Sequence, residues 1–300
     1  MGIYDNEKRM WFGTEERMGW IETPLSGADV SPAGWSADAT MLNGGGFALN
    51  SWASHKRFSF GWGESATRQL ASTLHSYADG SFGRALLYFL DPMWYEINVL
   101  PKHWADPSMA LNAEAPPLIY DVDPSSTPTS PNSNNLPVQT AIYTPPTAGF
   151  NQADSLFIPI PEGHYLHLGA VYTRTGTGGV FYSPVSLTGA TGAAVLLPQT
   201  APNAATLNAT VIPQSGLKGI RLWIGKTSGA ASTVSITGMV ARISSPSDAI
   251  GGMLERNWLG GQGHTGCRFV GKPTLVNYNG VLGGQVGVGA TFAEVGGWLD

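Results

Sequence analysis

The chain has 300 residues, a charged fraction of only 12% and a formal net charge of −5, with 39 Gly and 21 Pro. The length fits two domains, and abundant Gly and Pro interrupt helices and supply turns, so the composition predicts a mainly β fold. Because the chain has no cationic surplus, we do not expect it to bind nucleic acid, and the aromatic fraction of 10% argues against a disordered chain.

The single cysteine, Cys267, excludes an internal disulfide and suits assembly in a reducing cytoplasm. The first residues have neither the basic region nor the apolar run of a secretion signal. No run of about 18 apolar residues occurs, so we expect no membrane span.

Two strands are predicted in the first block of the chain. Residues 55–62 alternate, which places Phe58, Phe60 and Trp62 on one face. Residues 85–90 are continuously apolar, as in a strand that is covered on both faces.

The segment between these strands predicts the clearest helix. Its apolar residues recur at helical spacing on one stripe, namely Ala66, Leu70, Leu74 and either Tyr77 or Ala78. Ser65 is placed to cap the start of the helix and Gly80 to end it. A helix flanked by strands fits a small β-barrel or sandwich with one packed helix.

Charge and composition divide the rest of the chain. Residues 1–123 hold seven of the ten Trp residues, while residues 124–136 read as a linker of Pro and small polar residues. The block 137–245 shows short strands with turns at regular spacing, which predicts a β-sandwich resembling carbohydrate-binding modules.

Three strands of this middle block are predicted from their alternation. The residues expected to share an inner face are Leu166, Leu168 and Ala170 on one strand, and Ile220, Leu222 and Ile224 on another. Val234 and Ile236 begin a third strand, which Gly238 is expected to bulge.

The last block, residues 246–300, contains two predicted strands. One covers 267–270 and extends in the longer interpretation to Leu275; the other is 286–295, with Val286, Val288, Ala290 and Phe292 on one face. Two strands alone are marginally stable in water, so we expect them to complete the domain of residues 1–123, either in the same subunit or in a neighbouring one.

No constellation in the sequence predicts catalysis or metal binding. Residues 261–266 match a dinucleotide-binding glycine pattern, but a strand-like segment follows where a helix is required. His264 lies three residues before Cys267, yet no further polar group is placed to orient it, so a structural role is favoured. The odd spacing of His164 and His167 points them to opposite faces of a strand, where they cannot share one ion.

A glycosidase would need two carboxyl groups, which would have to be assembled from distant residues such as Asp91 and Glu96. The middle block, where a sugar would bind, is almost free of acids, so hydrolysis is not expected. We therefore predict no enzyme activity, no cofactor and no metal.

The candidate contact residues are Tyr165, His167 and Trp223, which alternation places on outer faces of the sandwich. We expect Trp223 to share its outer face with Arg221, because Arg is rarely buried without a partner. Their rings would either stack on a neutral host glycan or contact a neighbouring subunit, because Trp and Tyr are enriched at interfaces. The subunit contact is the favoured interpretation.

Four motifs in order carry a resemblance to a known family. They are Gly83 to Pro92 followed by Asn98 to Pro107, then His164 to Gly169, Gly263 to Phe269 and Phe292 to Trp298. In this order they resemble the minor tail proteins of long-tailed phages of actinobacteria, in particular the distal-tail-protein-like members, and they cover most of the chain.

The resemblance implies a structural protein of the virion tail tip, assembled in the host cytoplasm. Such proteins form homo-oligomeric rings, commonly hexameric and in some tip proteins trimeric, around the tail lumen. Their partners are the tail tube, tape-measure and tail-hub proteins. The alternative from another class is a glycan-binding tail adhesin that contacts the host cell wall.

Overall fold

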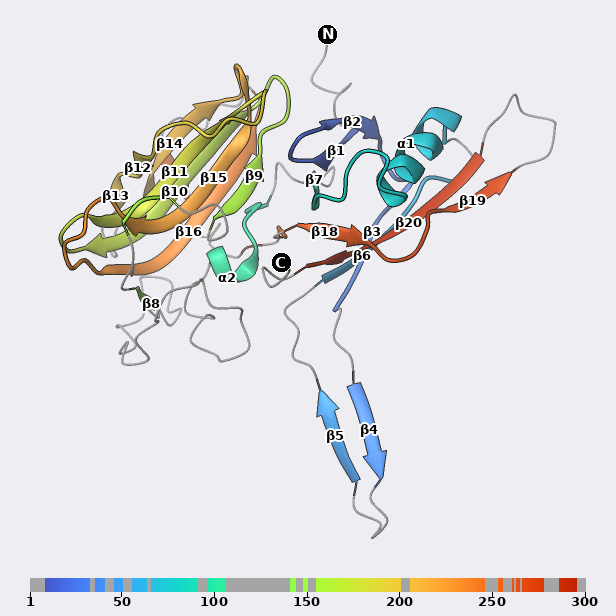
Figure 1. The fold of residues 1–300 in the computed structure, drawn as a ribbon, viewed down its shortest axis with the longest axis horizontal. Coiled ribbons are helices and arrows are strands. Elements are labelled where there is room, and N and C mark those ends of the chain that lie inside the picture. Colours follow the sequence, from blue (N-terminus) through green and yellow to red (C-terminus); the bar gives the residue numbers. More distant parts are fainter. Residues whose placement is uncertain are drawn as a thin grey trace. The chain divides into compact units, whose positions relative to one another are not determined.

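The computed structural model describes residues 9–32, 36–40, 46–50, 56–63, 66–90, 97–105, 141–143, 148–150, 155–200, 206–245, 253–255, 261, 263–264, 266–277 and 286–295. Within these residues the chain forms strands β1 to β20 and the helices α1 and α2, so the expected mainly β class is confirmed (Figure 1). No sheet among them closes into a barrel. The predicted linker at 124–136 and the acids Asp91 and Glu96 lie outside the described residues.

The chain divides into two compact units. Unit 1 comprises residues 1–20 and 87–265, and unit 2 comprises residues 21–86 and 266–300. The chain therefore leaves unit 2 and returns to it at its C-terminal end. The boundaries between these units differ from those at residues 123 and 246 that the distribution of charge and Trp indicates. The assignment of a ring-forming domain to 1–123 and 246–300 stays a prediction.

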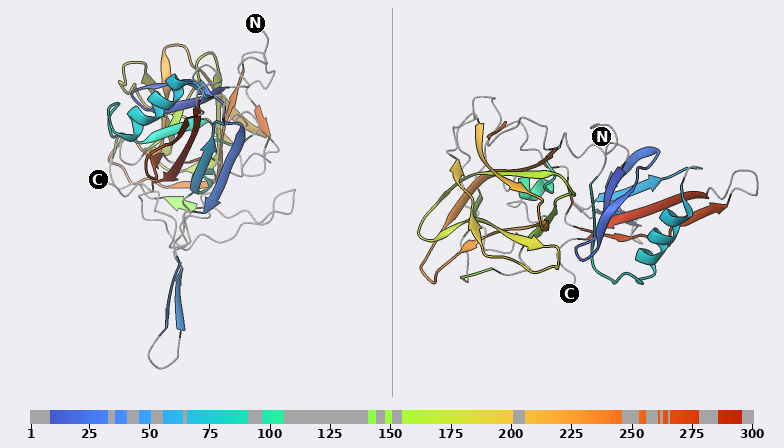
Figure 2. Two further views of the ribbon diagram at one scale, coloured as in Figure 1. Left: turned by 90° about the vertical axis from the view of Figure 1, so that its right-hand side faces the viewer. Right: turned by 90° about the horizontal axis from the view of Figure 1, so that it is seen from above.

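Unit 1 contains a sandwich of two sheets that face each other (Figure 2). One sheet has the order β17-β14-β10-β16-β8, with β13 also paired to β10. Its strands are β8 (Ala141–Tyr143), β10 (Tyr165–Arg174), β13 (Gln199–Thr200), β14 (Thr206–Pro213), β16 (Val234–Ser244) and β17 (Met253–Glu255). The other has the order β12-β11-β15-β9 and consists of β9 (Leu156–Pro159), β11 (Gly178–Ser186), β12 (Val195–Leu196) and β15 (Leu217–Lys226).

The inner faces of the sandwich agree with the alternation in the sequence. The residues predicted to face inward are all fully buried in one apolar cluster: Leu166, Leu168, Ala170, Ile220, Leu222, Ile224, Val234 and Ile236. The predicted irregularity beside Gly238 is also present, because Val171 pairs with Gly238 while Tyr172 pairs with Ile236, which leaves Thr237 as the extra residue of a bulge.

Segments from the first block are built into unit 1 by hydrogen bonds to β16. The Asn98 side chain donates to Met239 O and accepts from Ala241 N, and Val99 N donates to Ala241 O. The short helix α2 (Lys102–Ala105) follows this segment, and Trp104 is buried. A buried Asn that bonds the backbone of a strand more than 140 residues away explains why this segment belongs with the sandwich.

Unit 1 also contains β1 (Arg9–Thr14) and β7 (Leu87–Leu90), which pair antiparallel. All four residues of β7 are buried, as its continuous apolar run predicts. β1 is followed by β2 (Met18–Glu22), whose neighbour in the sheet is β1. The tight turn between β1 and β2 is closed by bonds in both directions between Thr14 and Arg17.

Unit 2 is built on an antiparallel sheet around the C-terminal strand β20 (Val286–Glu294). One side of β20 pairs with β6 (Lys56–Gly61), and β6 pairs in turn with β3 (Ser26–Pro32). The other side pairs with β18 (Cys267–Phe269) and then β19 (Thr274–Asn277). The sequence predicted one strand at 267–270 that extends to Leu275 in the longer interpretation. The structure has two shorter strands instead, β18 and β19, along the same side of β20.

A separate two-stranded ribbon pairs β4 (Ser36–Thr40) with β5 (Gly46–Asn50) in unit 2. Its strands lie in the sequence between β3 and β6, so it prolongs the connection between two paired strands. Among the described strands, β4 and β5 pair only with each other.

Helix α1 (Arg68–Ala78) packs against β20 and buries Leu70, Leu74 and Tyr77 of the predicted stripe, while Ala78 is partly buried. Ala66, the first residue of that stripe, is buried but precedes the helix. Its N-cap is Thr67, whose hydroxyl accepts from Leu70 N, and the predicted cap Ser65 lies outside the described residues. The Glu22 carboxylate accepts from both the amide and the hydroxyl of Thr67. Gly80 follows the helix in the left-handed conformation, with φ +82°, as expected for a helix end.

The apolar face predicted for the C-terminal strand forms the centre of unit 2. Val288, Ala290 and Phe292 are buried, and the Phe292 ring lies 5.8 Å from that of Phe60 and 4.6 Å from that of Phe269. The last block of the chain therefore supplies the core strand of this unit.

We predict that Phe292→Ala destabilises unit 2 by about 3–5 kcal/mol, because the ring is fully buried and its removal leaves a cavity. Urea unfolding measures the change. Thr291→Ala is the control, since Thr291 is half-buried on the other face and should cost less than about 1 kcal/mol. Equal losses for both variants would contradict this placement of β20.

Candidate functional site

The structure corrects the expectation that His167 is exposed. Tyr165 and His167 lie on the face of β10 opposite to the buried Leu166 and Leu168, as predicted, but His167 is only 3% exposed. Its Nε2 lies 2.8 Å from Ser244 Oγ on the neighbouring strand β16. Tyr165 is half-buried. The imidazole is therefore held within the sheet face and offers no open stacking surface.

Trp223 is also buried, with 2% of its surface exposed, so its predicted place on an open face is wrong. Its ring stacks on Phe181 at 4.6 Å with an interplanar angle of 18°, and Phe150 meets it edge-on at 5.7 Å. The indole Nε1 donates to Ser183 Oγ at 3.2 Å. These contacts satisfy both the apolar surface and the polar group of the side chain.

Gly225 explains how so large a ring is covered. It shares the strand face with Trp223, two residues along β15, and a Cβ at this position would collide with the six-membered ring of Trp223. The indole thus lies flat along the strand, over a residue without a side chain. A Gly two residues after a Trp in a strand was the sequence signal for this arrangement.

Arg221 is buried on the same face because it has a partner distant in the sequence. Its guanidinium forms an ion pair with the Glu15 carboxylate, and its Nη1 donates to Ser155 Oγ at 3.1 Å. Its Cζ lies 5.9 Å from the centre of the Phe157 ring. Arg221 agrees with the rule that Arg is rarely buried without a partner. Its partner Glu15 lies 206 positions away in the sequence, so no local pattern predicts the pair.

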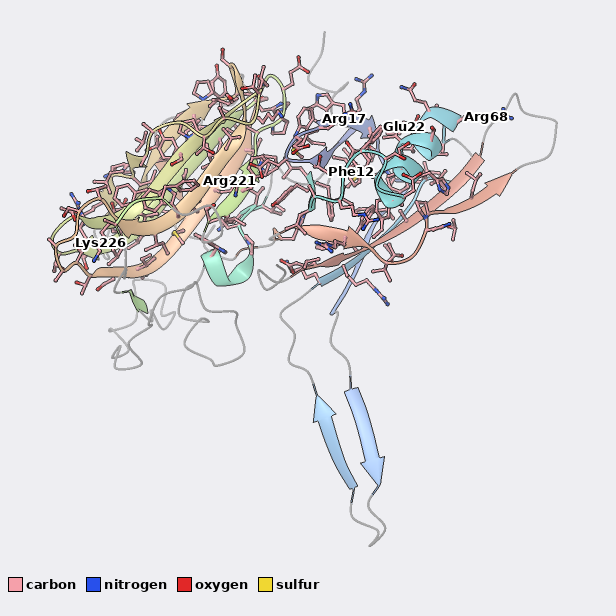
Figure 3. The ribbon with its side chains drawn as sticks, in the orientation of Figure 1. Phe12, Arg17, Glu22, Arg68, Arg221 and Lys226 are labelled. Atoms are coloured by element: carbon pink, nitrogen blue, oxygen red, sulfur yellow. The ribbon has the colours of Figure 1, made fainter. Side chains whose placement is uncertain are left out.

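A second cation secures the same turn. Lys218 Nζ donates to the main-chain oxygen of Glu16 at 2.7 Å. Glu15 and Glu16 lie between β1 and β2, so the turn is fixed to β15 by two charge-assisted contacts. Figure 3 labels Arg221, the β15 residue of the ion pair. Both contacts hold the structure of unit 1, and the Glu15 carboxylate is engaged by Arg221.

The two histidines of the middle block occupy separate environments. His164 is buried, its Nδ1 lies 2.9 Å from Glu162 O, and its ring centre is 5.8 Å from that of Trp20. His167 contacts Ser244 instead. No group of three or more His, Cys, Asp or Glu residues within the described part of the chain is arranged to hold a metal ion.

Cys267 is fully buried, and its environment disfavours the thiolate. Burial raises the pKa of the thiol well above its usual value, the Glu294 carboxylate raises it further, and Lys56 opposes this shift. The thiolate is the nucleophilic form, so the geometry fits a structural thiol.

His264, which the sequence places three residues before Cys267, packs its ring on Phe89 at 4.2 Å, and its Nε2 lies 3.1 Å from Phe89 O.

The glycine-rich segment before β18 has a packing role. A Cβ at Gly263 would collide with the main chain of Val99, and Gly263 N donates to Leu100 O at 2.9 Å. Strand β18 follows, where a dinucleotide site requires a helix. The glycine allows the close approach of two backbones.

The two outer strands of the unit 2 sheet are the exposed features that the sequence did not single out. Leu275 on β19 is 45% exposed, and Leu25, directly before β3, is 70% exposed. Ser26, Gly61, Gly289 and Thr274 pair across the sheet as one row, and both leucines lie beside it. Leu25 and Leu275 therefore stand at the same level on opposite edges of the sheet.

No helix among the described residues is long and apolar enough to cross a membrane.

No protein-family model matches the sequence, and no curated protein is significantly similar to it. The solved structures that align with the chain include two of infectious bursal disease virus. The Gt strain structure is 12% identical, with a TM-score of 0.21 over 95% of this chain and 74% of the other, and the Gx strain structure is 13% identical, with a TM-score of 0.20 over 96% and 80%.

A third match is the VP2 subviral particle of the same virus, 10% identical with a TM-score of 0.20 over 95% of this chain and 78% of the other. These similarities are weak and all are to structures of viral particles. TM-scores near 0.2 are below those of a shared fold.

We predict that Trp223→Ala destabilises unit 1 by about 3–5 kcal/mol, because the ring is buried among Phe181, Phe150 and Ser183. Thermal or urea unfolding measures this loss. A variant that unfolds like the parent protein would show that the indole is a surface contact after all.

We predict that Glu15→Gln costs about 1–3 kcal/mol, because it leaves the Arg221 guanidinium buried without its carboxylate. The Glu15 side chain keeps 22% of its surface exposed, which places the loss below that of a fully buried pair. In a double-mutant cycle with Arg221→Met, the second substitution should recover part of the loss. Additive losses would contradict a direct pair.

Proposed function

We propose that this protein is a structural component of a phage tail tip, which forms a homo-oligomeric ring through the sheet of unit 2. The four ordered sequence motifs that resemble distal-tail-type minor tail proteins support the tail-tip location. The observation that carries the ring is the pair of open edges on the unit 2 sheet.

The edges have the directions that a ring requires. β19, β20, β6 and β3 follow one another as antiparallel neighbours, so β19 and β3 run in opposite directions. Among the described strands each has a neighbour on one side only. Joining β19 of one copy to β3 of the next would continue the antiparallel pattern, and a head-to-tail contact of this kind gives a ring when the rotation between copies closes.

The exposed leucines favour this joint. An edge strand leaves main-chain donors and acceptors unpaired, and proteins usually protect such edges with charge or Pro. β3 does carry Asp29 and Pro32, but beside the row that joins Ser26 to Thr274 each edge has a large apolar residue, Leu25 on one side and Leu275 on the other. Sheet continuation would bury both and pair the open backbone groups.

The β4–β5 ribbon adds a second reason to expect assembly. A two-stranded ribbon is marginally stable in water, so it gains stability when a neighbouring molecule covers it. In the proposed ring, commonly of six copies by the family resemblance, the neighbours are further copies, the tail tube, the tape-measure protein and the tail hub.

Leu25→Cys and Leu275→Cys in a Cys267→Ser background test the head-to-tail joint. We predict that the double variant, treated with a short bismaleimide, gives a ladder of covalent multimers that ends at the ring size. Each single variant should stay monomeric under the same treatment, because a heterologous joint brings different residues together. Cryo-electron microscopy of intact tail tips should show the same ring where the protein is bound to the tail tube.

Two outcomes would contradict the proposal. Cross-linked dimers from a single-cysteine variant would indicate a twofold contact, and one isolated copy per tail tip would exclude a ring. Leu187→Cys, 56% exposed in the sandwich, is the matched control and should give no ladder.

A further inference from the structure

The sheet of unit 2 has a buried face and an open face. Phe58 and Phe60 on β6 and Phe292 on β20 lie on the buried face. Residues that alternate with them lie on the other face, which is the open one. The following side chains of the open face are exposed at least in part: Arg57, Ser59, Arg268, Thr274, Thr291 and Ala293.

Two arginines stand in one row of this open face. Arg57 on β6 and Arg268 on β18 are both paired with Ala293, from opposite sides of β20. Neighbouring strands are about 4.8 Å apart, so the two Arg backbones lie about 10 Å apart, with the alanine methyl group between them. Long side chains at this spacing can both reach a group that lies over Ala293.

Neither guanidinium has an ion pair or a hydrogen bond with the described residues. Glu294, the acid next to Ala293 in the sequence, alternates onto the buried face, where its carboxylate accepts from Lys56 N at 3.1 Å. Asp29 on β3 is paired with Ser59 in the next row, and β3 is three strands away from the strand of Arg268.

The arginine row contrasts with the charge of the whole chain, which has 21 acidic and 16 basic residues. Protein surfaces usually intersperse both signs, so that neighbouring charges compensate each other. A single exposed arginine is commonly only solvated and requires no ligand. Two arginines in one row of rigid strands, among small and neutral side chains, are instead arranged in advance to hold an anion.

The charge and the size of the row favour an acidic protein segment over a nucleic acid. Affinity for nucleic acid comes from many phosphate contacts, and the formal net charge of −5 opposes it. A short acidic segment needs few contacts, and a guanidinium matches a carboxylate in bidentate geometry. The small residues beside the arginines let the main chain of such a segment lie close to the sheet.

We propose that the open face of the unit 2 sheet docks an acidic segment of a partner protein, with carboxylates bound by Arg57 and Arg268 over Ala293. The next row holds Ser59 and Thr291, whose hydroxyl oxygens lie 3.2 Å apart. One hydroxyl donates to the other, so the second keeps its hydrogen for the segment. All these residues belong to one copy, so docking requires no ring.

Fluorescence anisotropy of a labelled hexaglutamate peptide, titrated with the full chain, tests the site. We expect saturable binding that weakens about threefold in Arg57→Gln and in Arg268→Gln, and about tenfold in the double variant, because both contacts are exposed to solvent. Arg68→Gln is the matched control, since Arg68 is an exposed arginine on α1 of the same unit, and it should bind like the wild type. A hexaglutamine peptide should not bind.

Two further variants and one further ligand separate a specific site from general attraction between charges. The double lysine variant, Arg57→Lys with Arg268→Lys, keeps both charges but loses the guanidinium forks, so its affinity should lie between those of the wild type and the double Gln variant. Urea unfolding of the double Gln variant should match that of the wild type, because both side chains are exposed.

Four outcomes would overturn the proposal. They are no binding of hexaglutamate by the wild type, undiminished binding by the double Gln variant, an equal loss in Arg68→Gln, and tighter binding of a short DNA duplex than of the peptide. The last outcome would assign the row to nucleic acid instead.

Discussion

Strand β20 is the constraint on which unit 2 depends, because its two sides pair with strands from opposite ends of the chain. β6 lies more than 220 residues before it and β18 and β19 directly precede it, so the sheet forms only when the C-terminal segment has returned. Closing so long a loop costs entropy, and the buried row of Val288, Ala290 and Phe292 under α1 offsets that cost. The same arrangement leaves β3 and β19 as the outer strands, and therefore determines where a second copy can join.

Alternation along a strand predicts which residues share a face, and the structure supports it at every described inner position of β10 and β15. It does not predict whether the other face is covered. Trp223 and Arg221 share a face, as expected, yet Phe181, Phe150 and the Glu15 turn cover that face. Coverage depends on contacts between residues far apart in the sequence, and a single sequence carries no local signal for Glu15 meeting Arg221.

The boundaries between units 1 and 2 could not be predicted from the sequence for a similar reason. Charge and Trp density separate residues 1–123 from the middle block, but composition does not record which backbone a polar side chain will bond. Asn98 bonds two main-chain groups of β16, and Gly263 lies against Val99, so both segments belong to unit 1. The helix and the strand 56–61 were predictable because their signals, a stripe and an alternation, are contained within one element.

Arg221 and Lys226 show two ways in which one strand accommodates a cationic side chain. They lie five residues apart and therefore on opposite faces of β15. Arg221 meets a carboxylate, and its burial is accounted for by the packing of the β1–β2 turn. Lys226 is the last residue of β15, and a long cationic side chain at such a place buries its aliphatic stem while its ammonium group reaches water.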